Sequence, residues 1–198
     1  MIWPPNITGV IHAGAHLAEE FTAYEEHGVT HTLWIEPQWK CAAEIRRRYG
    51  DLPGVEIWPV ALGRERGTRR LNQASNGQST SLLPPKEHRR AHPSITFSPG
   101  EWCVLETLDS YRTPPGRYQL LVLDCQGFEL EALEGAEWAL AGLSWVCSEV
   151  ARVELYAGQP LVGELRAWMS ERGWELVSEE WWPGSDEGEC VWRSKERT

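Results

Sequence analysis

Short apolar runs alternate with longer amphipathic segments along most of the 198-residue chain. A short apolar run bounded by Gly or Pro is typical of a buried strand, whereas apolar residues three and four positions apart indicate a helix. The apolar runs predict strands at 9–14, 31–37, 54–62, 118–124 and 143–150. The amphipathic segments predict helices at 17–28, 38–50, 128–142 and 161–173.

The order of these elements predicts an α/β fold. Strands that alternate with helices form a parallel sheet whose two faces are covered, and the almost wholly apolar run at 118–124 is typical of a central strand buried on both sides. Two further strands, at 174–182 and 188–194, are joined by the turn "PGSDEG". We therefore expect a mostly parallel sheet with an antiparallel C-terminal strand.

The segment at about 72–100 interrupts the alternation. It is rich in Ser, Asn, Gln, Gly, Pro and charged residues and has no clear apolar period. A structureless stretch longer than about 15 residues inside a compact domain is usually functional or disordered. We expect one domain over 1–198, in which 72–100 is an irregular insert that acts as a lid or contacts a substrate.

Composition and charge narrow the possible partners. The chain is 41% hydrophobic and 24% charged, as expected of a globular protein, and its formal net charge is -10. Like charge opposes general binding to nucleic acid or to anionic lipid, so we expect neither partner. The basic clusters at 46–48 and 86–90 are interpreted as solvated faces.

Cysteine usage and the absence of long apolar runs predict a cytoplasmic protein. No C-x-x-C spacing occurs, which argues against a disulfide framework and against a thiolate zinc site. No apolar run approaches the roughly 20 residues that span a bilayer, and the first residues do not have the pattern of a secretory leader. The cysteines are Cys41, Cys103, Cys125, Cys147 and Cys190.

The stretch "VIHAGAHLAEE" at 10–20 reads as a strand, a turn and the start of a helix. The first such turn of a parallel sheet commonly holds a nucleotide-like ligand, so Gly14 lies where a cofactor would be anchored. His16 and Ala18 stand where a dinucleotide site would need further glycines, which argues against a bound pyrophosphate. Glu36 follows Gly14 by 36 − 14 = 22 positions, close to the roughly 20 expected of an acid that holds ribose hydroxyls.

The alternative to a cofactor-binding turn is an ordinary connection between a strand and a helix. Gly14 would then only begin a helix, and Glu36 would be a solvated strand end. Spacing alone favours the two interpretations about equally.

Several short motifs, taken together, are far more specific than the turn. The segments are "AGAH" at 13–16, "IEP" at 35–37, "PVALG" at 59–63, "STSLL" at 79–83, "TLDSY" at 107–111, "LDCQGFELEALEGAE" at 123–137 and "VELYAGQPLVGELRAWMSERGWELV" at 153–177. In order and spacing they resemble the FkbM family of S-adenosylmethionine-dependent methyltransferases from about residue 10 to 180. The resemblance implies a Rossmann-like class I methyltransferase sandwich.

The resemblance also implies a set of contacts to S-adenosylmethionine. They fall on the first turn, the end of the second strand, the "VAL" segment and the end of the central strand: His12, Gly14, Ala15, His16, Glu36, Pro37, Ala61, Leu62 and Asp124. This chain departs from the family pattern at His12, where many methyltransferases have an acid, at Ala18, where they have glycine, and at Gln126, which replaces the acid of the "DVEG" element.

The implied reaction is transfer of a sulfonium methyl group to an acceptor, most often a hydroxyl. The enzyme must align the nucleophile and remove its proton. Asp124 is the first candidate for the base, with Glu129 and Glu149 as companions and His16 as a further candidate. Asp124 and Glu149 could instead help to hold a magnesium-like ion, although a metal is not favoured. Structural roles remain open for Glu129, Glu149 and His16.

The acceptor is a small molecule, a sugar or a peptide. We expect the insert to supply its contacts through Ser79, Thr80, Ser81, His88 and His92. The favoured function is O-methylation of a small-molecule or sugar hydroxyl. N-methylation of a peptide amide or amine is the alternative within the same fold, and a non-catalytic cofactor-binding module is the alternative outside catalysis. The sequence indicates no oligomeric state.

Overall fold

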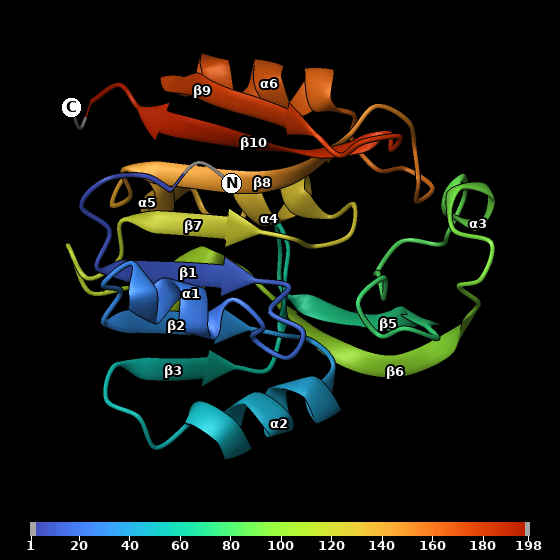
Figure 1. The fold of residues 1–198 in the computed structure, drawn as a ribbon, viewed down its shortest axis with the longest axis horizontal. Coiled ribbons are helices and arrows are strands. Elements are labelled where there is room, and N and C mark those ends of the chain that lie inside the picture. The colour runs from blue at the N-terminus through green and yellow to red at the C-terminus, as the bar shows by residue number, and fades with distance from the viewer. Residues whose placement is uncertain (1–2, 197–198) are drawn as a thin grey trace.

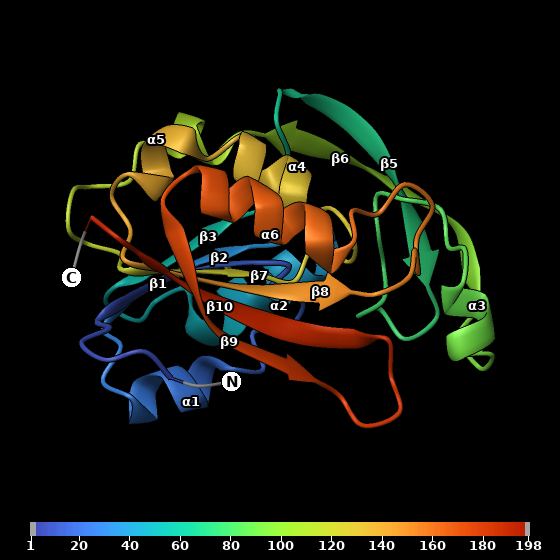
Figure 2. The ribbon, with the colours of Figure 1, turned by 90° about the horizontal axis from the view of Figure 1, so that it is seen from above.

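The computed structural model describes residues 3–196 and contains a seven-stranded sheet with helices on both faces (Figures 1 and 2). Residues 1–2 and 197–198, which belong to the expected domain, lie outside the described residues. The strand order is β3-β2-β1-β7-β8-β10-β9, and β10 is antiparallel to both of its neighbours. The expected fold class, including the antiparallel C-terminal strand, is therefore confirmed. The strands are β1 (Gly9–Ala13), β2 (His31–Ile35), β3 (Val55–Trp58), β7 (Leu120–Leu123), β8 (Trp145–Ala151), β9 (Trp174–Trp181) and β10 (Glu187–Ser194).

Helices cover the two faces unequally. One face carries α1 (Phe21–Glu26) and α2 (Trp39–Tyr49), and the opposite face carries the 3-10 helix η1 (Leu108–Tyr111), α4 (Glu129–Glu134), α5 (Glu137–Leu140) and α6 (Val162–Glu171) (Figure 2). No helix among residues 3–196 is long and apolar enough to cross a membrane.

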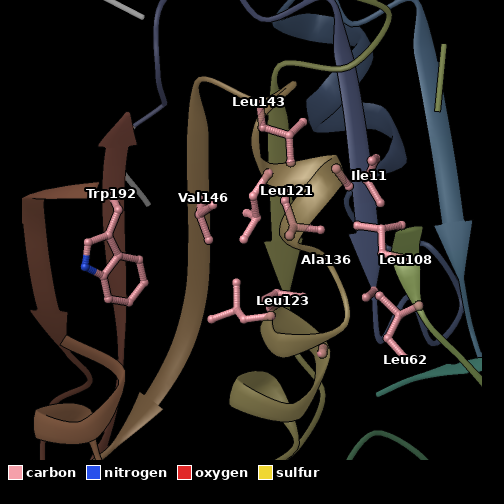
Figure 3. Close-up of a cluster of buried hydrophobic side chains, with 14 of the residues drawn as sticks. Ile11, Leu62, Leu108, Leu121, Leu123, Ala136, Leu143, Val146 and Trp192 are labelled. Atoms are coloured by element: carbon pink, nitrogen blue, oxygen red, sulfur yellow. The ribbon is translucent and has the colours of Figure 1, made fainter. Parts of the chain in front are cut away.

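Alternation along the central strands divides the core into two clusters. Ile11 on β1 and Leu121 and Leu123 on β7 point toward α4 and α5, where they pack with Ala136 and Leu143 (Figure 3). Val10 and Val122, their neighbours in sequence, belong to the cluster on the other face. Because both faces of β1 and β7 are buried, these strands read as continuous apolar runs rather than alternating ones.

A second, three-stranded sheet changes two of the expected boundaries. The run expected to form one strand at 54–62 instead forms β3, turns at Pro59, and continues as β4 (Ala61–Leu62) in the small sheet. The ends of the expected insert are paired strands, because β5 (Gly67–Ala74) and β6 (Phe97–Glu106) form an antiparallel pair that includes 72–74 and 97–100. The irregular part is 75–96, with the one-turn α3 (His88–Ala91). It lies beyond the carboxyl ends of β1, β7 and β8 (Figure 1).

Two of the expected helices are shorter than their amphipathic patterns. The helix expected at 17–28 begins only at Phe21, because the preceding turn has left-handed residues. The helix expected at 128–142 is interrupted at Gly135, where a Cβ would lie 2.0 Å from the carbonyl oxygen of Gly63. The break lets the backbone of the β4 region approach α4 and α5 closely.

Candidate active site

Two neighbouring cavities open at the carboxyl edge of the large sheet. The first encloses about 520 Å³ and the second, a wider groove, about 1090 Å³, each including its open mouth. They share the lining residues Gly14, His16, Gln78, Asp124 and Gln126. Ligands of open parallel sheets bind at this edge, so the shared residues mark the place where two ligands would meet.

The turn after β1 follows a path suited to glycine although it contains only one. Gly14 has φ +83°, and a Cβ there would lie 1.7 Å from the carbonyl oxygen of Asp124. His16 and Ala18 also have positive φ values, 43° and 57°. A non-glycine residue in this region costs about 1–2 kcal/mol. The chain therefore keeps the backbone of a glycine-rich turn at positions where glycine is replaced.

Glu36 fixes this turn and also lines the first cavity. Its Oε2 accepts a hydrogen bond from the backbone N–H of His16 at 2.8 Å, and its Oε1 accepts one from the N–H of Gln38 at 2.7 Å. Burial, which leaves Glu36 2% exposed, raises its pKa to about 7 despite these bonds. A carboxylate has about four acceptor positions, so two remain for a ligand in the cavity.

The rest of the first cavity is largely apolar. Pro37, Ala61 and Leu62 line it, and the other apolar lining residues are Ala13, Ile35, Val60, Leu71, Leu82, Cys125 and Phe128. An apolar slot with acceptor oxygens at one end matches the chemistry of an adenosine, whose base is flat and whose ribose carries hydroxyl donors.

Two acidic side chains meet where the first cavity joins the groove. Asp124 follows β7 and Glu149 lies on β8, and the side-chain amide of Gln126 donates to both, to Asp124 Oδ1 at 2.7 Å and to Glu149 Oε2 at 2.9 Å. Burial and the charge of Asp124 raise the pKa of Glu149 well above its usual range. Asp124 lines both cavities and is exposed, whereas Glu149 lines only the groove.

Tyr156 holds the amide of Gln126 in one orientation. The Tyr156 hydroxyl lies 2.6 Å from Gln126 Oε1 and 3.0 Å from the carbonyl oxygen of Ser79, so its single proton is directed toward these two acceptors, with Gln126 the nearer. Gln159 Oε1 accepts bonds from the N–H groups of Leu155 and Tyr156, at 3.1 and 3.2 Å, which stabilises the loop that carries the ring. With Gln126 Oε1 occupied, its NH₂ group faces the two acids.

The insert residues named from the sequence divide between the two cavities and the scaffold. Ser79, His88 and His92 line the groove, and Thr80 lines the first cavity. Ser81 lines neither, because its hydroxyl is 2.7 Å from the carbonyl oxygen of Gln126 and it is only 1% exposed. Ser81 therefore ties the insert to the loop after β7.

Two other candidates lie away from both cavities. Glu129 is buried, and its Oε1 accepts bonds from the N–H groups of Cys125 and Gly127, which stabilises the loop before α4; burial raises its pKa to about 7. His12 faces α1, and its Nδ1 is 2.9 Å from the hydroxyl of Tyr24. Burial lowers the pKa of His12. Neither side chain lines either cavity, and both make hydrogen bonds within the scaffold beside them.

Several residues at the site had not been named as ligand contacts. Gln38 directly follows Pro37, and Gln126, two positions after Asp124, had drawn attention only as a departure from the family pattern. Tyr156 comes from a segment 30 residues further along the chain, so no local pattern indicates its contact with Gln126. Glu19 lines the groove from the turn after β1. Among residues 3–196, no three His, Cys, Asp or Glu side chains are grouped to hold a metal ion.

Comparison with known proteins agrees with this architecture. A methyltransferase from Mesorhizobium loti described as S-adenosylmethionine dependent has a similar structure, with TM-score 0.57 and 10% identity, over 97% of this chain and 94% of that one. Magnesium protoporphyrin IX methyltransferase from Synechocystis, solved with bound S-adenosylmethionine, gives TM-score 0.54 and 10% identity over 94% of this chain and 69% of that one. The 2-O-methyltransferase NoeI of Sinorhizobium fredii is 28% identical over 171 residues, which cover 81% of this chain and 68% of that protein.

The sheet order, the single antiparallel strand and the cavity at the carboxyl edge define a Rossmann-like class I methyltransferase fold. The methyltransferase FkbM domain matches residues 12–176. The chain belongs to this family, as its motifs had suggested, and is a methyltransferase that uses S-adenosylmethionine.

Proposed function

We propose that the protein methylates a hydroxyl group of a small molecule or sugar. The observation that carries this proposal is the position of Asp124, which lines both cavities at their junction and accepts a hydrogen bond from Gln126. An acidic side chain at this point has access both to a cofactor in the first cavity and to an acceptor in the groove. The similarity to a 2-O-methyltransferase supports oxygen as the methylated atom.

The first cavity would hold the nucleoside part of the cofactor. Glu36 would accept hydrogen bonds from the ribose hydroxyls, while Pro37, Ala61 and Leu62 would pack against the adenine. Gly14, Ala15 and His16 would lie along the part of the cofactor that extends toward the groove. Bound S-adenosylmethionine supplies an electrophilic methyl group on a positively charged sulfur.

Asp124 would take the proton of the acceptor hydroxyl as the hydroxyl oxygen bonds to the methyl carbon, while the bond between that methyl group and sulfur breaks and S-adenosylhomocysteine is left. Gln126 would hold the Asp124 carboxylate in position, and its amide also donates to Glu149, whose pKa is raised by burial and by the charge of Asp124. His16 is the other group at the junction, but its Nδ1 lies 2.7 Å from Glu19 Oε1, and this contact directs that nitrogen toward Glu19 rather than toward an acceptor.

Calorimetry and labelled-methyl transfer test the proposal. The purified protein is expected to bind S-adenosylmethionine and S-adenosylhomocysteine but not NAD, and to transfer labelled methyl groups to alcohols and glycosides. Asp124→Asn should lower kcat by about 10²–10⁴-fold, the usual range for loss of a general base, with unchanged affinity for S-adenosylhomocysteine. Asp51→Asn, at an exposed loop position, serves as the control.

The position of the methyl group in the product decides between oxygen and nitrogen. Methylation of an amine or amide instead of a hydroxyl would overturn the proposed acceptor class. Full activity of Asp124→Asn would overturn the proposed role of Asp124.

A further inference from the structure

The groove that would hold the acceptor is lined by acidic side chains but, among the described residues, by no Lys or Arg. Five of its lining residues are acidic: Glu19, Glu20, Asp124, Glu149 and Glu187. These acids come from the turn after β1, the ends of β7 and β8, and the start of β10. The groove therefore carries an excess of acidic groups, which face the uncharged and histidine side chains that the insert contributes.

Only neutral groups and histidines accompany these acids inside the groove. His92 Nε2 lies 3.0 Å from Glu187 Oε2, and the hydroxyl of Ser185 donates to the same oxygen at 3.1 Å. His16 lies beside Glu19, and His12 Nδ1 lies 4.0 Å from Glu20 Oε2. The groove thus attracts a cation and repels an anion, and its partly enclosed walls strengthen both effects.

His88 provides an independent sign that the groove is built for a polar ligand. The residue is 1% exposed and is one of the residues that line the groove, and its Nδ1 has no hydrogen-bond partner among the described residues. Burial and His92 lower its pKa, which favours the neutral ring. A buried polar atom without a partner costs about 1–3 kcal/mol, and a ligand with hydroxyl or amine groups could recover part of this.

Trp182 adds an apolar contact surface to the groove. It lies just after β9, lines the groove and is 46% exposed, so part of its ring is free to pack against a ligand. An exposed aromatic ring combined with several hydrogen-bonding groups suits a sugar, which has an apolar ring face and polar edges.

We propose that the acceptor is a polyhydroxy compound with an ammonium group, of the amino-sugar class, and that the groove excludes anionic sugars. This inference rests on the proposed function and makes its acceptor class more specific. The ammonium group would be attracted by the acidic wall, the hydroxyls would reach Asp124 and His88, and the sugar face would lie against Trp182.

Three matched ligands test the charge preference directly. The methyl glycosides of glucosamine, glucose and glucuronic acid differ chiefly in charge, and each would be titrated calorimetrically at neutral pH into protein saturated with S-adenosylhomocysteine. The glucosamine derivative is expected to bind about tenfold more tightly than the glucose derivative, and the glucuronic acid derivative to bind more weakly than either. Added salt should reduce these differences.

Glu187→Gln removes one acid of the groove while keeping an acceptor oxygen for His92 and Ser185. It should reduce the preference for the amine severalfold and leave the affinity for S-adenosylhomocysteine unchanged. Glu25→Gln, at an exposed position of α1 that does not line the groove, should change neither quantity.

Equal binding of all three glycosides, tighter binding of the acid, or binding of none of them would overturn the inference. The proposed function is tested separately, by labelled-methyl transfer to hydroxyl acceptors of any charge. Transfer only to a neutral or acidic alcohol would support the proposed O-methyltransferase activity but contradict an amino sugar as the acceptor. If no hydroxyl is methylated although cofactor binding is intact, the proposed O-methyltransferase activity itself is refuted.

Discussion

Glu36 both supports the turn after β1 and faces the first cavity, and its replacement by Gln tests whether it also binds the cofactor. In the structure, each carboxylate oxygen accepts one backbone N–H, from His16 and from Gln38, and the remaining acceptor positions are available to the cavity. Gln has one acceptor oxygen instead of two, and its NH₂ group would face either a backbone N–H or a ribose hydroxyl. At least one hydrogen bond to a charged acceptor is lost in the complex.

A hydrogen bond to a charged group contributes about 1.5–3 kcal/mol, so the variant should bind S-adenosylhomocysteine about 10- to 150-fold more weakly. Isothermal titration calorimetry at pH 8 measures this change when Glu36 is mostly ionised, given its pKa of about 7. Circular dichroism checks that the fold is retained, and Glu25→Gln is the matched control on α1. Unchanged affinity in a folded Glu36→Gln protein would refute the assignment of Glu36 to the ribose and favour a non-catalytic module.

Three further outcomes are expected. Gly14→Ala should abolish cofactor binding and lower Tm, as read by calorimetry and thermal melting, because its Cβ would overlap the carbonyl of Asp124; normal binding would contradict the described turn. Tyr156→Phe should lower kcat about 5- to 10-fold, because it removes the hydrogen bond of about 1 kcal/mol that orients Gln126. The Kd of S-adenosylhomocysteine should stay constant. Tyr118→Phe, which is remote from both cavities, is the control. Burial raises the pKa of Glu36 and Glu129 from 4.5 to about 7, so the folded state holds these protons more tightly than the unfolded chain. Their stabilisation is complete below about pH 4.5 and is lost as pH rises through 7, by up to about 3 kcal/mol each. Urea unfolding at pH 5.5 and 8 should show this loss, and Glu129→Gln should reduce it; a stability that rises over this range would refute the stated effect of burial.

The order of the main strands and helices could be predicted because it depends on apolar periodicity within short windows. The boundaries that were wrong depend on contacts between distant segments. Pro59 redirects the chain from one sheet to another, and the polar strand β5 is recognised only through its pairing with β6. Neither event changes the local apolar pattern.

The candidate site divides in the same way. Gly14 and Glu36 could be located because consecutive strands of a parallel sheet bring their carboxyl ends to one edge. His12 was expected at the ligand, but strand alternation turns its side chain toward Tyr24 on the α1 face. Gln126 and Tyr156 could not be paired from the sequence, since their contact depends on the path of the loop after β8.

The contacts of Tyr156 join parts of the enzyme that are often considered separately. Its hydroxyl touches both Gln126, beside the proposed base, and the carbonyl of Ser79 in the insert, while the insert backbone is bonded to neighbouring Leu155 through Lys86 and His88. Tyr156 therefore helps to position both the insert, which would contact the acceptor, and Gln126, which would orient the proposed base Asp124. Exchange of residues 75–96 with those of a relative would alter catalytic alignment together with acceptor choice, so that new specificity in this protein requires changes on both sides of Tyr156.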